Sequence, residues 1–74
     1  MVIIIEGEKF NAAQAIKLIK SRGGSTLVPL EIGNGMVKFA GRNLSTFQDV
    51  VEGDCTLGEY SEINKKLRSS ALGS

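Results

Sequence analysis

Few side chains in this sequence could carry out acid–base or nucleophilic chemistry. Histidine is absent, and Cys55 is the single cysteine. Asp54 precedes Cys55, and a neighbouring carboxylate raises the pKa of a thiol and so weakens it as a nucleophile. Without a partner base or a second cysteine, Cys55 is predicted to be a buried hydrophobic residue. The same composition excludes a disulfide within the chain and a zinc site of the Cys/His type.

Acidic residues form two short groups, each of which is a candidate for a catalytic carboxylate pair or a Mg²⁺ site. Glu6 and Glu8 lie two residues apart, and Asp49, Glu52 and Asp54 lie close together. We interpret them as charges at helix starts and in solvated loops rather than as a metal site.

Two glycine-rich stretches, residues 22–24 and 33–35, are the only candidates for a phosphate-binding loop. Neither lies between a strand and the start of a helix with the spacing that such loops need. A helix end and a hairpin turn account for them. We therefore expect no enzyme activity, no cofactor and no metal.

Basic side chains offer a different chemistry, the binding of nucleic-acid phosphates. The candidates are Lys17, Lys20, Arg22, Lys38, Arg42, Lys65, Lys66 and Arg68. Basic residues near helix C-termini also have a simpler explanation, because they meet the negative end of the helix dipole. Nine Lys/Arg against eight Asp/Glu give a net charge of +1, which argues against affinity dominated by phosphates. Nucleic-acid binding is therefore the alternative function rather than the favoured one.

The length of 74 residues predicts a single domain, residues 1–74, with a small core. Such a chain buries only about 60% of the surface that its unfolded form exposes, so a partner subunit or protein would help to stabilise it. The apolar start is followed at once by acidic residues and has neither the basic region of a signal peptide nor the length of a membrane span. We expect a cytoplasmic protein with no membrane partner.

Three capping boxes predict where helices begin. Asn11 with Gln14 starts a helix over about 12–22, which ends at Gly23-Gly24. Ser45 with Gln48 predicts a short helix that stops at Gly53. Thr56 with Glu59 starts a last helix that runs to about Ser69, and residues 70–74 are predicted to fray.

One pair of residues predicts a β-hairpin. Asn34-Gly35 is a preferred pair for a two-residue turn, and apolar residues alternate on both sides of it. The predicted register places Ile32 opposite Val37, Glu31 opposite Lys38, and Leu30 opposite Phe39. Pro29 lacks an N–H group, so its strand should lie at a sheet edge.

These elements predict an α+β fold with a small three-stranded sheet, in the order β-α-β-β-α-α, and helices packed on one face. A right-handed crossover would join the first two strands, and of the strand orders 1-3-2 and 1-2-3 we favour the first. The predicted core consists of Ile3, Ile5, Ile16, Ile19, Val28, Leu30, Val37, Phe39, Phe47, Val51, Ile63 and Leu67.

The first strand connects this fold to a function. Val2 to Ile5 are all β-branched, and a three-stranded sheet would leave this strand with an unprotected edge. Either the last helix covers that edge or another chain pairs with it, and we favour another chain, with Val2, Ile4 and Glu6 as the partner-binding residues. The sequence thus predicts a small non-enzymatic protein, a regulator or inhibitor of the accessory kind that phages and plasmids often encode, acting through protein–protein contacts, with homodimerisation as one form of such contact.

Overall fold

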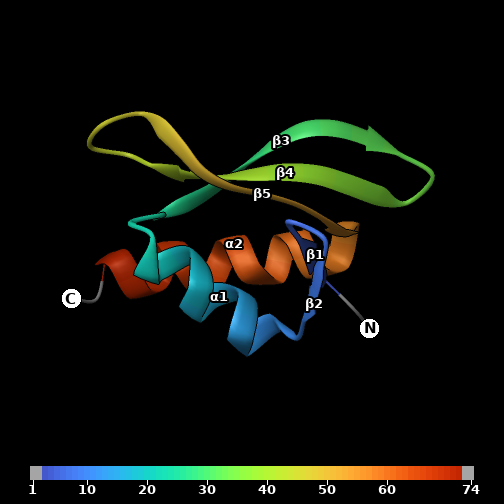
Figure 1. The fold of residues 1–74 in the computed structure, drawn as a ribbon, viewed down its shortest axis with the longest axis horizontal. Coiled ribbons are helices and arrows are strands. Elements are labelled where there is room, and N and C mark those ends of the chain that lie inside the picture. The colour runs from blue at the N-terminus through green and yellow to red at the C-terminus, as the bar shows by residue number, and fades with distance from the viewer. Residues whose placement is uncertain (1–2, 73–74) are drawn as a thin grey trace.

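The computed structural model describes residues 3–72, and the side chains of residues 3–69. The elements are β1 (Ile3–Ile5), β2 (Glu8–Phe10), α1 (Ala12–Ser21), β3 (Thr26–Gly33), β4 (Met36–Asn43), β5 (Gln48–Thr56) and α2 (Leu57–Leu72). The five strands form one antiparallel sheet in the order β2-β1-β5-β4-β3. Both helices lie on the same side of the long strands β3, β4 and β5, and β1 and β2 stand at one end of the molecule (Figure 1). The α+β class and the one-sided helix layer agree with the sequence analysis, but the three-stranded sheet was wrong.

A tight hairpin between β1 and β2 is the first strand pair that the sequence analysis missed. Glu6 and Gly7 both have positive φ angles, 52° and 83°, as a two-residue type I′ turn requires. Ile3 pairs with Phe10 across this turn. Because β5 pairs with the other side of β1, the first strand lies between two neighbours and has no open edge.

The first helix begins as its sequence predicts. The Asn11 side chain accepts a hydrogen bond from the Gln14 amide at 2.8 Å, and the Gln14 side chain accepts one from the Asn11 amide at 3.1 Å. Gly23 follows the helix with a φ of +86°, a left-handed conformation that glycine adopts without strain. The capping box and the end of this helix are confirmed. The predicted parallel crossover was wrong, because the sheet is antiparallel throughout.

The Asn34-Gly35 hairpin is confirmed close to its turn. Ile32 pairs with Val37, and Glu31 pairs with Lys38. The predicted pairing of Leu30 with Phe39 was wrong, because the register shifts between Pro29 and Glu31 and Pro29 takes the place opposite Phe39. Proline cannot donate a ladder hydrogen bond, and a bulge at this position accommodates it at the edge of the sheet.

The short helix predicted after Ser45 is absent, and its residues belong to a turn and to β5. Two valines, Val50 and Val51, lower the helix propensity of this segment and favour a strand. As a strand, β5 pairs with β4 on one side and β1 on the other, and Val51 and Cys55 enter the core. The three predicted strands keep the relative order 1-3-2, with the Pro29 strand at the edge, but β5 lies between β1 and the hairpin, so the predicted direct pairing of β1 with the hairpin was wrong.

The last capping box is confirmed at the start of α2. The Glu59 carboxylate accepts hydrogen bonds from the Thr56 amide and hydroxyl, and the Glu59 amide donates to the Thr56 hydroxyl. The helix then continues to Leu72, beyond the predicted end at Ser69. Of the tail that was predicted to fray, residues 73–74 lie outside the described residues.

The core lies between the sheet and the two helices. Eight predicted core residues are buried: Ile3, Ile5, Ile19, Val37, Phe39, Val51, Ile63 and Leu67. Ile16 and Val28 are only partly buried. Leu30 and Phe47 were wrongly assigned, with 47% and 75% of their surface exposed. Leu30 lies in the bulge, and Phe47 lies in the turn that replaces the predicted helix.

Candidate functional site

Exposed apolar side chains are concentrated in the turns and at element ends. The large ones among the described residues are Leu30, Ile32, Met36, Leu44, Phe47 and Leu57. Phe47 is the most exposed of them at 75%, and it shares the turn between β4 and β5 with Leu44, which is 51% exposed. Residues 44–47, named here the Leu44–Phe47 loop, project at the end of the molecule opposite to β1 and β2 (Figure 1).

Asn43 holds the Leu44–Phe47 loop in one conformation. Its side-chain oxygen accepts hydrogen bonds from the amides of Ser45 and Thr46, at 2.8 Å and 2.9 Å. Its carbonyl accepts the Phe47 amide at 2.7 Å, and its side-chain nitrogen donates to the Gly23 carbonyl at 2.8 Å. A single asparagine therefore closes the loop and ties it to the turn that follows α1.

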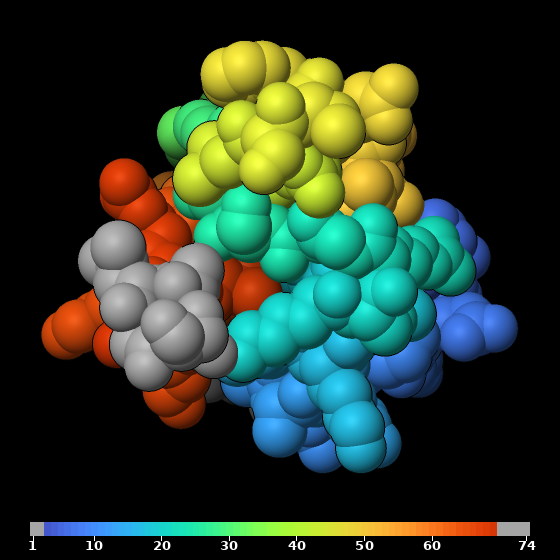
Figure 2. All heavy atoms as spheres, turned by 90° about the vertical axis from the view of Figure 1, so that its left-hand side faces the viewer, coloured from blue at the N-terminus to red at the C-terminus, as the bar shows by residue number. Residues whose placement is uncertain are grey.

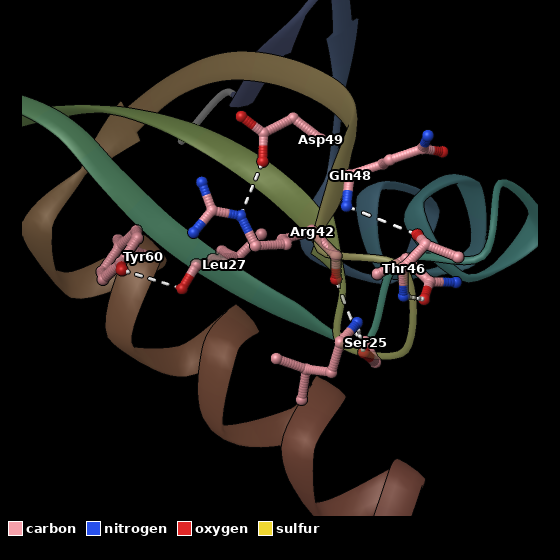
Figure 3. Close-up of polar contacts among 9 residues, drawn as sticks. Ser25, Leu27, Arg42, Thr46, Gln48, Asp49 and Tyr60 are labelled. Carbon is pink, nitrogen blue, oxygen red and sulfur yellow. Dashed lines mark hydrogen bonds and ion pairs between the residues drawn. The ribbon is translucent and has the colours of Figure 1, made fainter.

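Ser25 supports the loop from the same turn, as the close-up in Figure 3 makes visible. Its hydroxyl accepts the Leu44 amide at 3.1 Å, and its amide donates to the Arg42 carbonyl at 2.9 Å. Beside the loop, the Arg42 side chain donates to the Asp49 carboxylate at 2.7 Å (Figure 3). This hydrogen bond raises the pKa of Arg42 and keeps its charge paired. The polar groups around the loop are thus largely satisfied.

The backbone of Phe47 is strained. Its φ angle is 60°, in the left-handed region that bulky side chains rarely adopt. Glycine or asparagine would occupy such a position without this cost. Strain of this kind persists only where the surroundings impose it, and it is concentrated at functional sites. The loop therefore holds an exposed aromatic ring at a position where folding alone would favour a smaller residue.

The predicted partner-binding residues lie elsewhere. Val2 lies outside the described residues. Ile4 and Glu6 line a shallow depression of about 260 Å³ together with Glu52 and Asp54. The Glu6 carboxylate is already paired with Arg22, at 2.6 Å. The open strand edge that singled out these residues does not exist, since β2 covers it.

The edge of β3 is protected by two side chains of α2 and by a proline. The Leu27 amide donates to the Asn64 side chain at 3.0 Å, and the Leu27 carbonyl accepts the Tyr60 hydroxyl at 3.2 Å. The N–H and C=O groups of Leu27 therefore point away from β4. Two residues further along the strand, the backbone of Pro29 faces the same edge, and proline has no N–H group that a partner strand could bind. The other edge strand, β2, has three residues and carries Glu8 and Lys9. Native sheets use these devices to prevent strand addition.

Most of the basic residues proposed for nucleic-acid binding have partners or a structural role. Two of them are in the ion pairs already described, Arg22 with Glu6 and Arg42 with Asp49. A third ion pair joins Lys66 to Glu62 on the surface of α2. Lys38 lies between Glu31 and Asp54 in the sheet register. Lys20 is in the last turn of α1, where the helix dipole favours a positive charge. Lys17 is exposed on α1.

Lys65 and Arg68 are the two members of the predicted set that share a groove. They lie on α2 beside Tyr60 and Asn64, in an open depression of about 570 Å³ that Ser61 and Ser69 complete. None of these lining residues is acidic. The structure therefore brings together two of the eight predicted cations in a recognisable site and disperses the others.

Cys55 is buried in the core with no exposed surface, as the sequence predicted. Burial, reinforced by the charges of Glu59 and Asp54, raises the pKa of its thiol to about 11. The thiol is therefore protonated at neutral pH. Among residues 3–72, no cluster of His, Cys, Asp or Glu side chains is arranged to hold a metal ion, and no described helix is long and apolar enough to cross a membrane.

Comparisons with models of protein families, with curated protein sequences and with solved structures give no match for this chain. The function must therefore be argued from the described side chains.

The Leu44–Phe47 loop was missed because Phe47 was assigned to an amphipathic helix and hence to the core. A signal was present in the sequence. Asn43 precedes a leucine, two hydroxyl residues and a phenylalanine, and asparagine side chains readily accept hydrogen bonds from amides two and three residues ahead.

Proposed function

We propose that this protein is a small non-enzymatic binding protein that acts on another protein through the Leu44–Phe47 loop. The proposal places it in the cytoplasm as an accessory regulator or inhibitor. One observation carries it: Phe47, 75% exposed and in a left-handed conformation, donates its amide to the Asn43 carbonyl at the end of a loop that the Asn43 side chain closes.

Aromatic residues are enriched at the centres of protein interfaces, where they fill apolar pockets of the partner. A loop that hydrogen bonds already hold in one conformation has less conformational entropy to lose on binding, and this favours affinity. The Leu44–Phe47 loop has both properties, with paired polar groups around two exposed apolar side chains. Pairing of strands across an open edge, in contrast, has no support from the protected edges of β2 and β3.

Nucleic-acid binding receives less support. Arg22, Arg42 and Lys66 are engaged in ion pairs, and the net charge of the chain is +1. A protein that neutralises many phosphates needs free cations along a continuous path.

The test is a photo-crosslink in cells that produce this protein. Phe47 is replaced by benzoylphenylalanine, which keeps an aromatic ring at the loop, and the control carries the same group at Ile32. Ile32 is also exposed, at 61%, but lies at the hairpin turn. We expect an adduct of one defined mass from position 47 and none from position 32, and competition by wild-type protein but not by the Phe47→Asn variant.

An adduct with a second copy of the chain would identify the partner as the protein itself and would still support the loop. Equal adducts from both positions, or undiminished competition by Phe47→Asn, would refute the proposal.

A further inference from the structure

The groove along α2 contains two cations, Lys65 and Arg68, that form no ion pair with a described carboxylate. Its lining residues are Tyr60, Ser61, Asn64, Lys65, Arg68 and Ser69. Glu62, three residues before Lys65, is bound to Lys66 at 2.9 Å instead.

The helix dipole does not account for these two cations. The dipole effect falls off within the last turn of a helix. Because α2 continues to Leu72, its last turn carries no basic residue, and Arg68 lies before that turn. The explanation that holds for Lys20 at the end of α1 therefore fails for Lys65 and Arg68.

The groove also offers neutral hydrogen-bonding groups. Asn64 uses its side-chain oxygen for Thr26 and Leu27, which leaves its amide nitrogen available as a donor. Tyr60 donates its hydroxyl proton to the Leu27 carbonyl, and it lines the same depression as Arg68. Burial raises the pKa of Tyr60, and the positive charge of Arg68 opposes this rise. Two cations and several donors, with no acid among them, form a surface that suits carboxylate oxygens.

We propose that this groove binds an acidic segment of a protein partner. The proposal rests on the proposed function, since the acidic segment belongs to the partner of the Leu44–Phe47 loop. Viewed from the end that carries this loop, the loop in yellow and part of α2 in orange to red are both visible (Figure 2). A partner that approaches this end of the molecule can therefore reach both the loop and α2. Two cations are too few for nucleic-acid affinity, which requires many phosphate contacts.

The experiment is a titration of isotope-labelled protein with a hexaglutamate peptide at low salt, followed by NMR of the backbone amides. We expect the largest shifts among residues 60–69. The Lys65→Gln/Arg68→Gln double variant should bind the peptide about fivefold more weakly, the sum of two surface charge pairs. The control, Lys9→Gln/Lys17→Gln, removes the same charge from exposed positions and should bind as the wild type does.

The same titration is repeated with hexathymidylate. Tighter binding of this oligonucleotide to residues 60–69 would overturn the proposal and assign the groove to nucleic acid. Absence of peptide binding, or equal weakening in the control, would also overturn it. The Phe47→Asn variant should still bind hexaglutamate, so failure of the groove and failure of the loop give different results.

Discussion

Replacing Phe47 by asparagine separates the contribution of this residue to folding from its contribution to binding. Asparagine adopts the left-handed conformation more readily than phenylalanine, because its short polar side chain can hydrogen-bond locally. It also avoids the flexibility that glycine would add to the unfolded chain. The substitution therefore relieves strain at φ 60° and removes an exposed ring without disturbing the hydrogen bonds made by Asn43.

The two energetic effects nearly cancel. A phenylalanine side chain buries about 200 Å² when fully enclosed. With 75% of Phe47 exposed, about 50 Å² are buried, which contributes at most about 1.2 kcal/mol at 25 cal/mol per Å². The left-handed conformation costs a residue of this kind about 1–2 kcal/mol. The free energy of unfolding should thus stay within about 1 kcal/mol of the wild-type value, or rise.

Urea denaturation of the wild type and of Phe47→Asn, followed by far-UV circular dichroism, measures this difference. A change of 1 kcal/mol corresponds to about 4–8 °C in Tm for a domain of this size, so thermal unfolding gives an independent check. A loss of more than about 2 kcal/mol would show that the ring packs against the fold, and would remove the reason for assigning it to a partner.

Three further predictions concern the core. Phe39→Ala should lower the free energy of unfolding by about 3–5 kcal/mol, measured by the same denaturation, because this ring is fully buried. Gly53→Ala should be severely destabilising, since a Cβ atom there would clash with the Ile4 carbonyl oxygen, whereas at Gly33 the space is open and the matched Gly33→Ala variant should unfold near the wild-type midpoint. Because burial raises the pKa of Cys55 from 9.0 to about 11, the folded state binds more protons than the unfolded state between these values, so stability should decrease as pH rises from 9 to 11. A Cys55→Ala variant that lost stability just as steeply would contradict this assignment.

Local signals in the sequence were reliable where a single residue and its close neighbours determine the geometry. The Asn11 capping box and the Thr56 capping box form as predicted, since each needs only hydrogen bonds between residues three apart. The turn at Asn34 likewise fixed the register of the two nearest pairs. The register failed at Pro29, because a bulge depends on the pairing of the whole strand.

The box at Ser45 and Gln48 shows where the same logic fails. The residue types match a helix start, but the backbone amides of Ser45 and Thr46 are bound by Asn43, which competes for them as a turn former. Pairing of β5 with two neighbouring strands then outweighs any local helical preference. This tertiary contribution cannot be seen in a window of four residues.

The second hairpin was missed for a related reason. Glu6-Gly7 performs the same function as Asn34-Gly35, with similar positive φ angles. Glutamate is uncommon in a left-handed conformation, so the pair gave no recognisable turn signal. The ion pair of Glu6 with Arg22, at 2.6 Å, lies at this turn and links it to the end of α1. Because this hairpin was missed, the sequence analysis assumed a sheet of three strands with an open edge at β1. It therefore assigned partner binding to the first strand.

Closing that edge changes the kind of binding that the molecule supports. With β1 enclosed, β2 short and charged, and β3 capped by Tyr60 and Asn64, few backbone groups remain for a partner strand. Specific contacts must then come from side chains on rigid supports. The Leu44–Phe47 loop supplies an apolar anchor at one end of the molecule, and the α2 groove supplies positive charge along the last helix. An anchor contributes to affinity and charge contributes to orientation and association rate, so the two surfaces together describe a protein partner with an apolar pocket beside an acidic segment.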